Sequence, residues 1–267
     1  MTERQPHIIT YQGEQYQAIN WQGREWILQE TWGQVHEDKP YFWYDPSAVA
    51  IDRDDALLLK THHNPHYFPH INYTSEIGAG LVCCLNEFHF GSYKIVFILP
   101  KGAGMFPAAW MYRHPTVPPP TPGHGNWLNE YDFVEAYSKK NTSYKSFHLF
   151  RLRKLDKLES QLHYYDQGHK RYKIERFNLG WRDMIYSYLK GPYRPITIEV
   201  EWTPEHLHQK VNGRDHRIFK GDIMQHLQHP MRVVLNAGIR ARHLYDKNEV
   251  TTFRIPEFSY DSLINIS

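Results

Sequence analysis

The sequence predicts an all-β protein that folds as a two-sheet sandwich. Aromatic residues make up 15% of the 267 residues, and aromatic side chains favour strands. Short apolar runs recur along the chain and are separated by turn-forming residues. Helical periodicity is weak, with two patterns of about three turns or fewer at residues 181–189 and 223–227.

The expected strands follow one another through most of the chain. After a Trp-rich first segment, residues 22–43, two short strands within residues 48–60 flank a turn at residues 53–55. From residue 77 onward strands dominate. The main ones are expected at residues 80–85, 93–99, 131–137, 146–152, 196–202, 231–239 and 258–266.

Two of these strands differ in the spacing of their apolar residues. Residues 93–99 are apolar at nearly every position, which predicts a strand buried on both faces. Residues 196–202 alternate apolar and polar side chains, which predicts one buried face and one exposed face. Both kinds of strand occur in two-sheet sandwiches.

We expect a single domain over residues 1–267. The proline-rich segment 115–123 is neither helix nor central strand, but similar strand patterns continue on both sides of it. We therefore interpret it as a loop rather than a domain linker. Residues 154–195 match no pattern and are interpreted as an insertion.

Composition and charge narrow the functional classes. The formal net charge is only +2 and basic residues form no long run, so a nucleic-acid partner is not expected. No apolar stretch has transmembrane length, and residues 1–9 are polar and show no signal peptide, which leaves the localisation open. Neighbouring Cys83 and Cys84 would point to opposite faces of a strand, so no disulfide is expected between them. We expect a monomer.

Three acids close together in the strand at residues 131–137 are the main candidates for catalysis. A regular strand places Glu130, Asp132 and residue 134 on one face, and Glu135 on the opposite, buried face. An unpaired buried carboxylate is costly. A β-bulge at Phe133 and Val134 would add one residue and return Glu135 to the face of the other two acids.

That arrangement suits glycosidic bond cleavage. The outer two acids would lie ~13 Å apart at the backbone. If their side chains lean together, the carboxyl groups approach the ~5–5.5 Å typical of retaining enzymes. Adjacent carboxylates repel, so at least one pKa should exceed the ~4.3 of a free Glu, and Glu135 is the natural proton holder. The alternative is an exposed strand whose acids are merely solvated.

The segments around these acids form an ordered series. They read FGSYKI (90–95), LPKG (99–102), PAAWM (107–111), EWTPE (201–205), VNG (211–213), VVLN (233–236) and YDSLI (260–264), with TWG (31–33) and SAVAID (47–52) upstream. Trp127 precedes the acids, and His148 follows them. In this order, over most of the chain, the series resembles glycoside hydrolase family 16, the laminarinase, agarase and carrageenase group.

The resemblance implies a jelly-roll, concanavalin A-like sandwich with a concave substrate cleft. It implies that Glu130 is the nucleophile, Asp132 its helper and Glu135 the general acid/base. Tyr131 departs from the family, which has an aliphatic residue there, and Asn129 stands where Gly or Ser is common. Many relatives hold a structural calcium, but the closing strand here departs from their pattern. We expect no required cofactor and no metal ligands.

Other residues allow two interpretations each. Trp110 and Trp127 either stack on sugar rings or pack in the core. His148 either contacts Glu135 or the sugar, or is structural. Four histidines, His62, His63, His66 and His70, lie close in sequence without the spacing of a regular metal site. Several basic residues either meet an anionic, sulfated glycan or are ordinary surface: Arg113, Lys139, Lys140, Arg151 and Arg153.

The sequence thus predicts an endo-acting retaining glycoside hydrolase that cleaves a β-linked polysaccharide, either a β-glucan or a red-algal galactan. A non-catalytic lectin on the same sandwich is the first alternative, since fold alone does not exclude it. A transglycosylase is the second, since it would use the same catalytic residues. Polysaccharide is the expected partner, with neither nucleic acid nor membrane.

Overall fold

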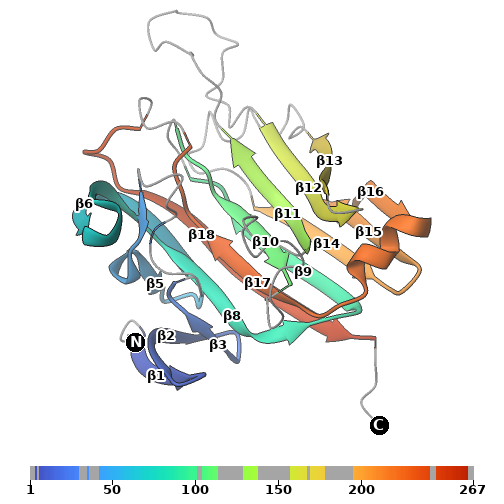
Figure 1. The fold of residues 1–267 in the computed structure, drawn as a ribbon, viewed down its shortest axis with the longest axis horizontal. Coiled ribbons are helices and arrows are strands. Elements are labelled where there is room, and N and C mark those ends of the chain that lie inside the picture. Colours follow the sequence, from blue (N-terminus) through green and yellow to red (C-terminus); the bar gives the residue numbers. More distant parts are fainter. Residues whose placement is uncertain are drawn as a thin grey trace, which may run out of the picture.

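The computed structural model describes residues 4, 6–29, 35, 42–100, 104–113, 129–137, 157–166, 169–177, 195–240 and 245–263 (Figure 1). These residues form two large sheets, and the predicted all-β sandwich is confirmed. Within the described residues the helices are short 3₁₀ turns: η1 (Pro46–Ala48), η2 (Pro69–Ile71) and η3 (Gly221–Leu227). None of the described helices has the length and hydropathy needed to cross a bilayer.

The first sheet carries the candidate acids. In spatial order its strands are β1 (His7–Tyr11), β2 (Glu14–Trp21), β3 (Arg24–Ile27), β8 (Leu81–Phe88), β17 (Met231–Asn236), β10 (Ala108–Tyr112), β11 (Asn129–Tyr137), β12 (Lys157–Asp166) and β13 (His169–Phe177). Every pair in this sheet is antiparallel. Strands distant in sequence, such as β8 and β17, are therefore neighbours.

The second sheet packs against the core-facing side of the first. Its order is β16 (Arg214–Lys220), β15 (His206–Val211), β14 (Ile196–Trp202), β9 (Gly91–Ile98), β18 (Thr251–Ser262), β6 (Leu57–Phe68), β7 (Tyr73–Ala79) and β4 (Trp43–Tyr44), and β5 (Val49–Ile51) pairs with β6. The pairing of β4 with β7 is parallel and the others are antiparallel.

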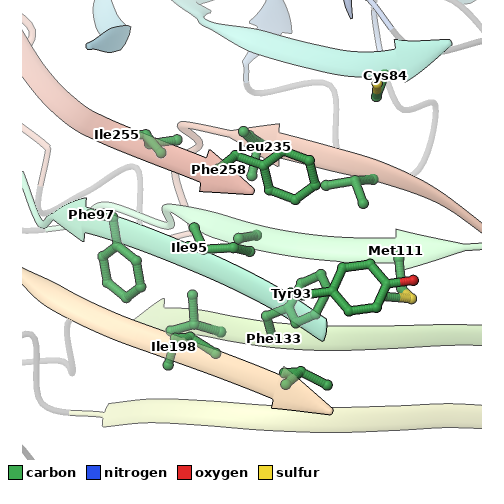
Figure 2. Close-up of a cluster of buried hydrophobic side chains, with 14 of the residues drawn as sticks. Cys84, Tyr93, Ile95, Phe97, Met111, Phe133, Ile198, Leu235, Ile255 and Phe258 are labelled. Atoms are coloured by element: carbon green, nitrogen blue, oxygen red, sulfur yellow. The ribbon is translucent and has the colours of Figure 1, made fainter. Parts of the chain in front are cut away.

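The main hydrophobic core lies between the two sheets. Figure 2 shows side chains from both sheets meeting there, among them Met111 of β10, Phe133 of β11, Ile95 of β9 and Ile198 of β14. Each buried Phe or Ile side chain contributes about 1.5–3 kcal/mol of transfer free energy. The core therefore fixes which face of β11 points inward.

Strand β9 corrects one prediction. The apolar run at residues 93–99 suggested burial on both faces, but only alternate residues are buried. Tyr93, Ile95 and Phe97 belong to the core, whereas Val96 and Ile98 are partly exposed on the opposite face of the second sheet. An apolar run alone does not reveal whether a second layer covers a strand.

Most other strand predictions hold, with shifted ends. Strand β14 has the predicted bounds, while the closing strand β18 begins at Thr251 rather than residue 258. The short helix expected at residues 223–227 is the 3₁₀ turn η3, which buries Met224 and Leu227. The strand predicted at residues 146–152 and the helix predicted at residues 181–189 lie outside the described residues.

The segment interpreted as an insertion contributes to the first sheet. Strands β12 and β13 fall within residues 154–195, and β12 pairs directly with the strand of the candidate acids. Whether this segment is an insertion stays a prediction, as does the single-domain assignment. Cys83 and Cys84 form no disulfide and lie on opposite faces of β8, as expected from strand geometry.

Candidate active site

Side chains of the first sheet alternate between the core and the opposite face, which we call the outer face. A second cluster of buried side chains covers part of the outer face. From the first sheet it contains Tyr16, Ala18, Ile27, Leu81, Cys83, Ala108, Trp110, Tyr112 and Val234. Phe42, Tyr44, Ile77, Ala79 and Ile239 complete it.

Strand β11 contains the predicted bulge. Its register against β12 shifts between Asp132 and Glu135, and its register against β10 shifts at the same place. At this place two residues of β11, Phe133 and Val134, lie opposite one residue of β12, Ser160. Both of these β11 residues pack into the core. The extra residue therefore turns Glu135 back to the face of Asp132.

The three acids share the outer face. Glu130, Asp132 and Glu135 pair across the sheet with Tyr112, Trp110 and Ala108, which all belong to the outer-face cluster. Directly opposite residues of an antiparallel pair point to the same face. Asp132 is 2% exposed, whereas Glu130 and Glu135 are partly exposed. The bulge and the shared face are confirmed, while the catalytic roles stay predictions.

Two polar side chains of β12 lie against these acids. His163 is opposite Glu130, and its Nε2 lies 3.6 Å from Glu130 Oε1 and 3.4 Å from Asp132 Oδ2. Gln161 is opposite Asp132, and its side-chain amide donates a hydrogen bond to Glu135 Oε2. A protonated His163 favours the ionised forms of both neighbouring carboxylates.

A buried polar network supports the bulge from the core side. Gln209 of β15 is 0% exposed, and its side-chain amide donates to the Phe133 carbonyl at 2.9 Å. Its Oε1 accepts hydrogen bonds from the hydroxyls of Tyr131 and Ser160. Ser160 Oγ also lies 2.9 Å from the Asp132 carbonyl. A bulge interrupts the backbone ladder. Gln209 donates to the Phe133 carbonyl there, and the single proton of the Ser160 hydroxyl is shared between the Asp132 carbonyl and Gln209 Oε1.

The network also explains a departure from the resembled family. Tyr131 stands between the first two acids in place of an aliphatic residue, and burial raises the pKa of its phenol well above the ordinary value. The protonated hydroxyl needs an acceptor in the core, and Gln209 provides it. Arg217 of β16 donates to the Ser160 carbonyl at 2.8 Å and stacks 4.0 Å from the Phe219 ring centroid.

The predicted sugar-binding residues are described only in part. Trp110 lies on the outer face beside Asp132, is 8% exposed, and donates from Nε1 to Asn236 Oδ1 at 2.8 Å. Its position fits the stacking interpretation, and its burial limits the area of ring that a sugar can contact. Trp127 and His148 lie outside the described residues, so their roles stay predictions.

One group of described residues has the composition of a metal site. Glu130, Asp132 and His163 each offer a ligand-type atom, and these atoms lie within 4.8 Å of one another. Two carboxylates and an imidazole suit a divalent cation, but the same contacts suit a hydrogen-bonded catalytic group. The expectation that no cofactor is required stays a prediction.

The four histidines that lie close in sequence do not converge on one site. His62 contacts Asp45, and the His66 ring lies against Trp43, tilted by 30° with 4.7 Å between ring centroids. His70 meets the edge of Phe68. His62 and His63 are neighbours on β6 and therefore point to opposite faces. The described residues hold no metal-type group that includes these histidines.

Sequence reasoning missed His163 and Gln161 because they lie in the segment that matched no pattern. The signal was present: Gln161 and His163 flank Leu162, and this alternation of polar and apolar residues is typical of a half-buried strand. What the sequence did not show was that this strand pairs with β11. Pairing is a non-local property that periodicity does not encode.

Comparison with known proteins supports the fold. No family model matches the sequence, and no curated protein matches it. Solved structures do match. The catalytic domain of an endo-1,3-β-glucanase (laminarinase) from Thermotoga petrophila RKU-1 aligns with a TM-score of 0.64 and 14% identity, over 98% of this chain and 100% of that chain.

Two further structures give the same result. The laminarinase catalytic domain from Thermotoga maritima MSB8 aligns with a TM-score of 0.61 and 16% identity over 84% of each chain. The kappa-carrageenase from Pseudoalteromonas carrageenovora aligns with a TM-score of 0.63 and 14% identity, over 91% of this chain and 92% of that chain. At these identities the likeness establishes a shared fold. It does not by itself establish a shared activity.

Proposed function

We propose that this protein is an endo-acting retaining glycoside hydrolase that cleaves a β-linked polysaccharide. The observation that carries the proposal is the bulge of β11, which puts Glu130, Asp132 and Glu135 on one sheet face. The structures that share the fold are named as glycan-cleaving enzymes, laminarinases and a carrageenase, which supports the same class here.

In the proposed mechanism Glu130 attacks the anomeric carbon while Glu135 protonates the departing glycosidic oxygen. Glu135 then takes a proton from water, which attacks the glycosyl–enzyme intermediate from the face that the leaving group vacated. Asp132 lies between them and shares a proton with a neighbouring carboxyl group, and a protonated His163 favours the ionised form of Glu130. Gln161 donates to Glu135 and fixes the orientation of its carboxyl group.

Replacement of the nucleophile is the most direct test. Glu130→Gln keeps the shape of the side chain but removes its nucleophilic charge, so we expect turnover to fall by at least ~10³-fold while glycan binding persists. The matched control is Glu205→Gln, which changes an exposed residue between β14 and β15 of the second sheet. Undiminished hydrolysis by the Glu130 variant would place the chemistry elsewhere. Binding without turnover in the unmodified protein would favour the lectin alternative.

Azide rescue separates the roles of the two glutamates on a substrate with a good leaving group. In Glu135→Ala, azide should attack the glycosyl–enzyme intermediate and give a β-glycosyl azide. In Glu130→Ala, azide should attack the sugar directly from the opposite face and give an α-glycosyl azide. The reverse assignment of products would exchange the two roles.

Stereochemistry tests the double displacement in the unmodified protein. NMR of the first-formed reducing end should show the β anomer, because two inversions retain configuration. An α anomer appearing first would exclude this mechanism. Laminarin, lichenan, agarose, porphyran and carrageenan form the substrate panel, and added acceptor sugars distinguish hydrolysis from transglycosylation.

A further inference from the structure

Arg232 of β17 is a buried cation on the outer face of the first sheet. The residue is 2% exposed. Its Nη2 donates to the Tyr11 hydroxyl, and its guanidinium lies 5.2 Å from the centroid of the Tyr11 ring. Its Nε and Nη1 are buried without a hydrogen-bond partner. Within the described part of the chain, no carboxylate forms an ion pair with it.

This state is unusual for a guanidinium. A buried charge is normally paired, because removal from water is costly and an opposite charge offsets that cost. An unpaired buried donor therefore calls for an explanation, such as a group that binds there. Tyr11 is partly exposed, at the end of β1, and both its hydroxyl and its ring contact the guanidinium. Displacement of the Tyr11 hydroxyl would expose neighbouring N–H donors to an incoming anion.

The position of Arg232 relates it to the proposed nucleophile. Arg232 pairs with Tyr112 of β10, and Tyr112 pairs with Glu130 of β11, so the three lie in one row across the sheet. Two strand spacings separate Arg232 from Glu130, which is about 10 Å at the backbone. That distance is comparable with the length of a disaccharide. A glycan lying across these strands would place one ring at Glu130 and a later one at Arg232.

The neighbourhood of Arg232 is aromatic. Tyr112 and Trp110 form an aromatic pair, with 5.2 Å between ring centroids, on the path from Glu130. Tyr11 and Tyr16 form another pair, with 6.5 Å between centroids, on the far side. Tyr112, Tyr16 and Trp110 are at most 8% exposed and belong to the outer-face cluster, whereas Tyr11 is partly exposed and can offer a ring face to a pyranose. A buried guanidinium among them adds selectivity for charge.

We propose that Arg232 is the binding group of a subsite for an anionic substituent of the glycan, either a sulfate ester or a uronic acid carboxylate. The inference rests on the proposed function, because it requires a glycan on the outer face. Guanidinium binds both groups through paired N–H donors. Tyr11 would move from Nη2 when the anion binds, and its ring would remain beside the sugar.

An internal partner for Arg232 is the competing explanation. Glu87 of β8 stands directly opposite Arg232 in register. It is exposed, however, and forms no ion pair with Arg232. Glu87→Gln therefore tests whether this carboxylate neutralises Arg232. We expect the variant to retain anion binding.

Calorimetric binding in a Glu130→Gln background tests the subsite without turnover. The probes are a neutral β-linked oligosaccharide of the best-bound backbone, its sulfated counterpart and its uronate-containing counterpart. We expect at least one anionic probe to bind about 10- to 100-fold more tightly than the neutral one, in line with hydrogen bonds to charged groups. Arg232→Met should abolish that difference. Which anionic probe gains affinity identifies the substituent.

Matched variants keep the result decisive. Arg214→Met removes an exposed arginine of the second sheet and should leave the charge preference intact. If Arg232→Met does not fold, Arg232→Lys keeps the charge but loses the paired donors, and it should lower the preference several-fold. Equal affinity for neutral and anionic probes, or a preference that survives both Arg232 variants, would overturn the subsite. A charge preference without any hydrolysis by the unmodified protein would overturn only the proposed function.

Discussion

Asp45 and Asp132 are each 2% exposed, and each lies beside a histidine, but their surroundings differ. Asp45, between β4 and η1, receives short hydrogen bonds from the groups around it. His62 Nε2 and Asn64 Nδ2 lie 2.6 Å from its Oδ2, and Ser47 donates to Oδ1 from both its backbone and its hydroxyl. Every donor here is directed at a single charge.

Asp132 sits instead between two further carboxylates. Glu130 and Glu135 share its face of β11, and the imidazole of His163 is 3.4 Å away rather than 2.6 Å. The His163 imidazole lies near two carboxylates, those of Glu130 and Asp132. The same pair of residue types therefore makes a structural contact in one sheet and a crowded acidic group in the other. The number of competing charges, more than the burial of the aspartate, distinguishes the two sites.

The largest expected effect is on catalysis at the crowded site. Asp132→Asn should lower kcat by about 10²–10⁴-fold, the range for loss of acid–base assistance, because the amide no longer tunes the charge of Glu130. Its free energy of unfolding should stay level or rise, since one of three neighbouring negative charges is removed. Steady-state kinetics and denaturant unfolding measure both. A large loss of stability in Asp132→Asn would make the two aspartates equivalent.

The second effect is on stability at the structural site. Asp45→Ala should lower the free energy of unfolding by about 3 kcal/mol, because His62 and Asn64 lose their shared buried acceptor. The kcat of the folded fraction should not change. Urea unfolding followed by tryptophan fluorescence gives the first quantity. A fall in kcat without loss of stability would contradict the structural assignment.

A smaller loss of stability is expected at the buried polar network of Gln209, which lies on the core side of β11. Gln209→Leu should cost about 2 kcal/mol, because it leaves the Tyr131 hydroxyl and the Phe133 carbonyl buried without their partner. Combining it with Tyr131→Phe should recover part of the loss, since one orphaned group disappears. A double-mutant cycle measures this coupling. Additive effects would mean that the two side chains act independently.

The smallest effect concerns acid stability. Burial alone raises the pKa of Asp45, but hydrogen bonds from Asn64, His62 and Ser47 outweigh it and hold the pKa below its ordinary value. The folded state therefore gains stability above the unfolded pKa of about 3.9, and this gain is lost as pH falls through the folded pKa. Asp45→Asn should flatten the stability profile below about pH 4. An unchanged slope in that range would show that other carboxylates dominate.

The bulge in β11 was predictable because the regular alternation of the strand conflicts with the charge of Glu135. Regular alternation would bury Glu135, and the cost of a buried carboxylate requires a bulge, which the register confirms. His163 and Arg232 were not predictable in this way. His163 does not conflict with its own strand pattern, and both residues matter through strands that are distant in sequence.

The apolar run of β9 shows where local sequence patterns fail to predict burial. Its composition is that of a strand covered on both sides, yet Val96 and Ile98 are partly exposed. Whether a layer lies over a strand depends on the rest of the chain. Local physical rules thus predicted the bulge and the sandwich, while long-range pairing determined which polar side chains meet.

The two neighbouring thiols of β8 give the protein an internal reporter of sheet opening. Cys83 faces the outer cluster and Cys84 faces the core, and both are 0% exposed. Burial also raises the pKa of Cys84 to about 12, so its thiolate is scarce while the sheet is closed. A thiol reagent that modifies Cys83 alone has detected loosening of the outer face. Modification of both means that β8 has separated from the sandwich.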